Sequence, residues 1–127
     1  AKDHKIITAS FININAVTAY LINQNTNIII LCSGWKGLFN LEDTIFAGAL
    51  AQKLLRNKKF HSNCDSLKAS IDLYNKGKNN LFKYLEKSSY RKRNISKEII
   101  RDTHFCLNPT FNSEIIPIFK NGKLVKK

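Results

Sequence analysis

The pattern of apolar and polar positions divides the first half of the chain into strands and helices. The apolar, β-branched stretch at 5–11 predicts a strand, and apolar positions at helical spacing predict a helix over 14–25. Residues 28–32, with the sequence IIILC, form an apolar run without alternation. Such a run favours a strand that is covered on both faces at the centre of a sheet. A loop at 33–40 then leads into a predicted helix at 41–55.

The second half of the chain is predominantly helical and closes with a hairpin. Three segments have apolar residues at helical spacing: 63–76, 78–88 and 94–108. Asn121-Gly122 between two short apolar runs is a strong hairpin signal, and Pro117 places its strand near a sheet edge. The order of elements predicts an α/β fold for a single domain over 1–127: a layered α/β/α domain with a mixed, partly parallel sheet and a C-terminal β-hairpin.

Composition adds limits on class and compartment. No apolar run approaches the roughly 18 residues that a membrane span needs, and no signal-like start is visible, so we expect a cytoplasmic protein without a membrane partner. The three cysteines, Cys32, Cys64 and Cys106, are far apart and odd in number, which is typical of free thiols. Because the chain begins with Ala1 and soon enters a predicted strand, we expect it to be a piece of a longer polypeptide.

A formal net charge of +12 raises the question of a nucleic-acid partner. The lysines are spread along the chain, and the one dense basic group is Tyr90-Arg91-Lys92-Arg93, in a predicted loop. A solvated loop is the favoured interpretation of that group, and a contact to an anion or to nucleic acid is the alternative. We therefore expect no specific nucleic-acid partner.

The loop at 33–40 is the candidate ligand site, because it follows a predicted central strand and precedes a helix N-terminus. Gly34 and Gly37 would let backbone N–H groups approach a bound oxyanion, and the helix from Leu41 would add unpaired donors and positive potential. The alternative is a well-capped helix, in which Asn40 is the N-cap and the acidic residues that follow only complement the helix dipole. The residues alone leave both interpretations open.

Several other phosphatase chemistries do not fit. A cysteine phosphatase needs an arginine six positions after its nucleophile, and the residue at that distance from Cys32 is Leu38. There is no Asp-x-Asp after a strand and no phosphate-binding loop ending in Gly-Lys-Ser/Thr. The histidines lack a paired metal-binding spacing: His4, His61 and His104.

A set of short motifs, in order and spacing, resembles the second half of the 2-phosphosulfolactate phosphatase family over nearly the whole chain. The motifs are Ser10-Phe11 with Asn13, Cys32-x-Gly34, Gly37-x-Phe39, Glu42-Asp43, Ala47-Gly48, and Asp102 with Cys106. The resemblance implies an α/β, Mg²⁺-dependent phosphatase that hydrolyses phosphate monoesters of 2-hydroxy carboxylic acids. Its expected substrate is 2-phosphosulfolactate, which yields sulfolactate and phosphate in coenzyme M biosynthesis.

The resemblance also implies roles for individual residues. Glu42 and Asp43 are expected to hold Mg²⁺, directly or through water, and Ser10 and Asn13 to contact the substrate carboxylate or metal-bound water. These four are the expected catalytic residues. The expected substrate-binding residues lie in one turn, where backbone N–H groups and a lysine would hold the phosphoryl group: Cys32, Ser33, Gly34, Lys36 and Gly37.

Family members are longer than this chain, which resembles only their second half. The expected partner is therefore the missing N-terminal half, fused to it or present as a second chain, and self-association into a homo-oligomer stays open. The chain also departs from the family pattern at Trp35, Leu38 and Tyr90, where a small hydroxyl residue, a basic residue and a histidine are common. The alternative functions are a non-catalytic anion-binding lobe or divergent paralogue and, third, a basic nucleic-acid-binding module.

Overall fold

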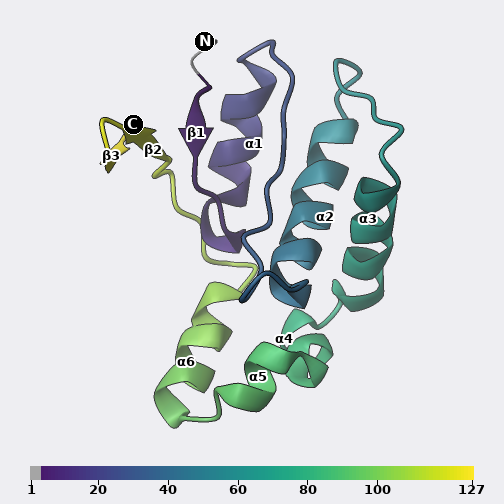
Figure 1. Cartoon of the computed structure of the whole chain (residues 1–127), viewed down its shortest axis with the longest axis vertical. Coiled ribbons are helices and arrows are strands. Elements are labelled where there is room, and N and C mark those ends of the chain that lie inside the picture. The colour runs from purple at the N-terminus through teal and green to yellow at the C-terminus, as the bar shows by residue number, and fades with distance from the viewer. Residues whose placement is uncertain (1–3) are drawn as a thin grey trace.

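The computed structural model describes residues 4–127, which form a mostly helical fold with a small sheet. The elements of the N-terminal half are β1 (Ile6–Ile7), the 3-10 turn η1 (Phe11–Asn13), α1 (Ile14–Ile22) and α2 (Leu41–Leu55). Those of the C-terminal half are α3 (Asp65–Gly77), α4 (Leu81–Tyr84), η2 (Leu85–Lys87), α5 (Ser89–Arg93), α6 (Lys97–Cys106), β2 (Pro117–Lys120) and β3 (Lys123–Lys126). Figure 1 shows α1, α2 and α3 standing together, with α4 to α6 across their lower end.

The sheet has three antiparallel strands in the order β1-β2-β3. Its C-terminal hairpin confirms the prediction from Asn121-Gly122, since both residues have positive φ angles of 49° and 77°. The predicted edge position of Pro117 is wrong, because β2 is the central strand of the three. Pro117 is tolerated there as the first residue of the strand, where its carbonyl accepts a bond from the Thr8 N–H at 3.1 Å.

The predicted central strand at 28–32 is not formed, and the predicted parallel pairing is not seen within residues 4–127. Ile28 and Ile30 are partly buried and pack against the core, whereas the side chains of Ile29 and Leu31 are both 89% exposed. The segment is extended, but no described strand lies beside it to complete a ladder. The prediction failed because it assumed a cover for both faces, and the described chain supplies only one.

The helices agree better with the prediction, because their hydrogen bonds are local. The helix at 41–55 is confirmed over its whole length, and those predicted at 63–76 and 94–108 are present as α3 and α6. The segment at 78–88 is divided between α4 and η2. The basic group at 90–93 lies within the short helix α5, so its assignment to a loop is wrong.

The core lies between α1, α2 and the first two strands. Val17 on α1 and Ile45 on α2 are fully buried, and Val17 belongs to one cluster with Ile116 and Ile118. Helix α2 approaches α3 closely at Gly48, where an added Cβ would overlap the backbone of Ser70. These contacts hold the N-terminal end of α2, and therefore the loop before it, in a defined position.

Candidate functional site

The loop between residues 33 and 40 contains a tight turn. The N–H of Trp35 donates to the carbonyl of Leu38 at 3.1 Å, and the N–H of Leu38 donates back to the carbonyl of Trp35 at 2.9 Å. Lys36 and Gly37 between them have positive φ angles of 51° and 74°, as the two central residues of a type I′ turn do. Figure 1 shows this loop at the N-terminal end of α2, and Arg93 at the end of α5 lies 5.2 Å from the Trp35 ring.

Asp43 anchors the turn to α2. Its Oδ2 accepts the N–H of Gly34 at 2.9 Å and the hydroxyl of Ser33 at 3.4 Å, while its own N–H donates to the Asn40 side chain at 3.0 Å. The predicted N-cap is therefore confirmed. Asn40 therefore caps α2, while the Asp43 side chain holds the predicted phosphate loop.

Glu42 points to a different partner. Its Oε1 accepts a short hydrogen bond from the hydroxyl of Ser88, a buried residue that caps α5. The Ser88 oxygen in turn accepts the N–H of Arg91 at 3.2 Å. Glu42 thus links the start of α2 to the start of α5, a connection between residues 46 positions apart in the sequence.

Two cations lie at the loop. The Arg93 guanidinium is 5.2 Å from the centroid of the Trp35 ring, and the Lys36 ammonium is 5.9 Å from the same centroid. Lys36 was predicted from sequence, whereas Arg93 and Ser88 were not assigned to the site. The signal that could have found them is the basic group at 90–93, which follows a serine in an N-cap position.

The backbone donors of the loop divide into two groups. The N–H of Gly34 already donates to Asp43, and the N–H of Trp35 donates to the Leu38 carbonyl within the turn. Within the described chain, the N–H groups of Ser33, Lys36 and Gly37 have no hydrogen-bond partner. The loop therefore offers donors beside two cations, a combination that suits an oxyanion.

Cys32 lies next to this anchor. Desolvation by the surrounding protein, and secondly the negative charge of Asp43, raise the pKa of the Cys32 thiol. A raised pKa keeps the thiol protonated at neutral pH, and only the thiolate is a strong nucleophile. This agrees with the sequence-based exclusion of cysteine-phosphatase chemistry at Cys32.

Ser10 and Asn13 lie at the same end of the molecule, since Phe11 in η1 packs edge-on against Phe46 of α2 with 5.3 Å between ring centroids. Asn13 is buried, accepts the Ser10 N–H at 2.8 Å and donates to the Ile115 carbonyl at 3.0 Å. Its side chain therefore ties η1 to the C-terminal segment. Neither residue contacts the loop or its two carboxylates in the described hydrogen bonds.

Mg²⁺ in proteins prefers one or two carboxylates and keeps several waters. Glu42 and Asp43 each use one carboxylate oxygen in the bonds above and keep the other free of protein partners among residues 4–127. No third acidic, histidine or cysteine side chain joins them in a cluster there. Each of the two residues therefore keeps one carboxylate oxygen that is available to a cation.

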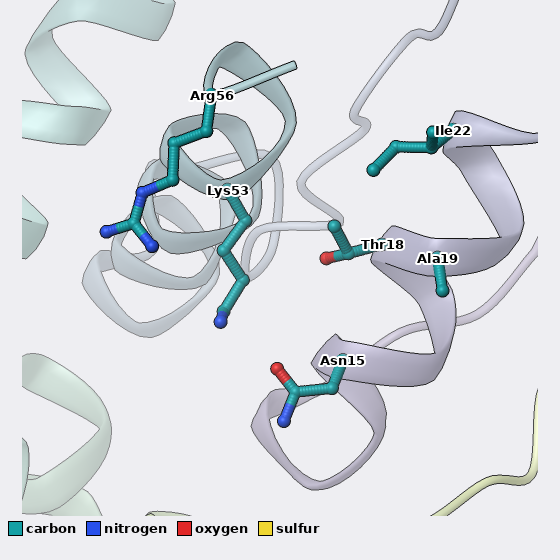
Figure 2. Close-up of a pocket in the computed structure, with 6 residues that line it drawn as sticks. All are labelled: Asn15, Thr18, Ala19, Ile22, Lys53 and Arg56. Atoms are coloured by element: carbon teal, nitrogen blue, oxygen red, sulfur yellow. The ribbon is translucent and has the colours of Figure 1, made fainter.

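A hollow of about 280 Å³ lies between α1 and the C-terminal part of α2. Figure 2 shows the residues that line it: Asn15, Thr18, Ala19, Ile22, Lys53 and Arg56. None of the predicted site residues is among them, and Lys53 and Arg56 belong to the end of α2 that is remote from Asn40. The loop remains the candidate site.

The fold and the site define a helical protein with a small antiparallel sheet, in which a glycine-containing loop, two carboxylates and two cations meet at a helix N-terminus. A profile of the family described as 2-phosphosulpholactate phosphatase matches residues 1–122. The chain belongs to this family, as the resemblance implied.

Comparison with individual relatives supports the same family assignment. A protein of Caldanaerobacter subterraneus named "Probable 2-phosphosulfolactate phosphatase" is 32% identical over 122 residues, which cover 96% of this chain and 50% of the relative. Relatives with the same name occur in Thermotoga petrophila, at 32% identity over 99% of this chain and 53% of the relative, and in Prochlorococcus marinus, at 41% over 69% and 37%. The chain therefore spans about half the length of the curated relatives it matches.

Across residues 4–127, no helix has both the length and the apolar character needed to cross a bilayer.

Proposed function

We propose that this chain is the C-terminal half of a Mg²⁺-dependent phosphatase that hydrolyses 2-phosphosulfolactate to sulfolactate and phosphate. Family membership over residues 1–122 is the observation that carries the proposal. The names of the relatives indicate the substrate class, a small phosphorylated 2-hydroxy acid. In this proposal the chain acts only when the half that it lacks is fused to it or bound as a second chain.

The phosphoryl group would lie against the turn of residues 33–38. The N–H groups of Lys36 and Gly37 donate to its oxygens, and the side chains of Lys36 and Arg93 offset its charge. Donors that are fixed before the reaction stabilise the charge that develops on the phosphoryl oxygens. Asp43 is a positioning residue for this turn, because it holds Gly34 and Ser33 in place.

Glu42 and Asp43 are the residues of this chain that would hold Mg²⁺. When bound, the ion polarises the phosphoryl oxygens and offsets their charge. Glu42 would keep its bond to Ser88 through one oxygen, and this bond fixes the direction of the other. Ser10 and Asn13 remain proposed polar groups at the same end of the molecule, and Ser10 is the exposed one of the two.

The missing half is required because the described site is open and incomplete. The charge of a transferring phosphoryl group must be surrounded by donors, and this chain covers one side of it. In the complete protein we propose the α/β/α arrangement with a mixed sheet, in which residues 1–127 form one domain-sized lobe.

The proposal is tested by phosphate release from 2-phosphosulfolactate, catalysed by this chain combined with the unmatched half of the Caldanaerobacter relative. Asp43→Asn should lower kcat by about a hundredfold, because loss of the charge weakens both the anchor and the metal site. Asp65→Asn is the matched control, since Asp65 is exposed and, among residues 4–127, pairs only with Lys68 at 3.2 Å.

Two results would reverse the proposal. If Asp43→Asn and Asp65→Asn retain the same rate, Asp43 has a structural role only. If the combined protein binds inorganic phosphate yet hydrolyses none of a panel of 2-phospho-carboxylates, the chain is the non-catalytic anion-binding lobe.

A further inference from the structure

Residues 28–32 have the shape of a β-strand without a sheet. Ile28 and Ile30 face the core, and the alternate side chains of Ile29 and Leu31 are 89% exposed. Alternation of this kind is the mark of a strand with one face packed on helices. The opposite face consists of two large apolar side chains, which a soluble protein rarely leaves uncovered next to each other.

The backbone of this segment is also unpaired. Within residues 4–127, no hydrogen bond joins an N–H or carbonyl group of 28–32 to another group of the protein. An extended segment presents these groups sideways, as a template for another strand. Strand β1 is paired on one edge only, with β2, so its second edge has no strand partner among the described residues.

The two free edges are related by the chain path. Figure 1 shows β1 descending, α1 returning upward, and the segment that contains 28–32 descending again toward α2. Residues 28–32 therefore run in the same direction as β1. Strands that pair with the free edges of β1 and of residues 28–32 would extend the small antiparallel sheet into a mixed one.

We propose that residues 28–32 are the seam on which a strand of the missing half of the protein docks by β-strand addition. This inference rests on the proposed function, in that it takes the occupant to be the half needed for activity. The choice of occupant follows from chain length. The match covers 50% of the Caldanaerobacter protein, so a segment about as long as this chain has no counterpart here. Strand addition would satisfy the free backbone groups, and a further element of the same half, packed on the face of the sheet opposite the core, would cover Ile29 and Leu31.

The seam leads directly into the site. Cys32 ends the segment, and the next two residues, Ser33 and Gly34, are those held by Asp43. Docking at 28–32 would therefore fix the positions of both the second half and the phosphate loop. This gives a physical reason why activity would depend on assembly.

The test is association of this chain with the unmatched half of the Caldanaerobacter relative, measured by sedimentation and by backbone hydrogen exchange without substrate. We expect a one-to-one complex in which the amides of 28–32 become protected. Ile29→Lys should weaken binding by at least about tenfold, since an ammonium would be buried beneath the docked half. Ile95→Lys is the matched control, because Ile95 is 77% exposed in the connection between α5 and α6.

Three outcomes would overturn the inference: equal binding by both variants, a complex in which 28–32 stays unprotected, or a homodimer of this chain that protects the same amides. The phosphatase proposal is judged separately by turnover. A protected complex without turnover overturns the function and keeps the seam, whereas turnover with 28–32 unprotected overturns the seam and keeps the function.

Discussion

At the scale of single residues, the two loop glycines make different demands. A Cβ on Gly34 would lie 2.5 Å from the carbonyl oxygen of Leu38, whereas a Cβ on Gly37 would meet no atom within 4 Å. Both have positive φ angles, 69° and 74°, so alanine costs about 1–2 kcal/mol at either position. Gly34→Ala should cost a further 1–3 kcal/mol or so, because the turn must open.

Urea unfolding of the two variants measures this difference, and phosphate release by the assembled protein should follow the same order. Equal losses of unfolding free energy would show that the closed turn between Trp35 and Leu38 is not present in solution.

The pH dependence of Cys32 provides a second prediction at this scale. Because desolvation and the charge of Asp43 raise its pKa, alkylation by iodoacetamide should rise with pH at a higher midpoint than for a short cysteine peptide. Asp43→Asn should lower the midpoint in part, since it removes the smaller of the two causes and keeps an acceptor for Gly34. The measurement uses the chain with Cys64 and Cys106 replaced by serine. A midpoint at or below that of the peptide would place Cys32 outside this environment.

Some site residues were predictable because their signals are local. Asn40 precedes an apolar periodic segment with an acid three positions later, and it does cap α2. The link from Glu42 to Ser88 joins distant parts of the chain, so no spacing in the sequence reports it. Asn13 lies in η1 and its side chain donates to the Ile115 carbonyl, which only the tertiary structure shows.

At the scale of elements, the contact between α2 and α3 is the most restrictive. Gly48→Ala would place a Cβ on the backbone of Ser70, so the two helices would have to separate. We expect a loss of about 1–3 kcal/mol of unfolding free energy, because the backbone cannot move away as a flexible side chain can. Ser66→Ala is the control, an exposed position in α3 where alanine mainly improves helix propensity. A Gly48→Ala variant as stable as Ser66→Ala would contradict the close approach.

The elements also explain why only part of the fold could be predicted from the sequence. Helices α2, α3 and α6 follow from periodicity and caps within their own residues. A strand needs a neighbour, and residues 28–32 have none in the described chain. The apolar run at 28–32 thus has the sequence pattern of a buried strand, but the described chain leaves one face of this segment uncovered.

At the scale of the whole molecule, several features are likewise covered or paired on one side only. The chain spans about half of the relatives it matches, its sheet ends at unpaired edges, and its loop offers donors on one side of a candidate phosphate position. The net charge of +12 is spread along the sequence, with one dense basic group at 90–93. The account therefore depends on assembly with the second half.

The most direct test is the initial rate of phosphate release from 2-phosphosulfolactate in Mg²⁺, with a fixed amount of this chain titrated with the unmatched half of the Caldanaerobacter relative. The account predicts negligible release by either part alone and a rate that rises until the two are equimolar and then stays constant. A complex that forms in equal amounts, as sedimentation would show, and still releases no phosphate at any ratio would contradict it.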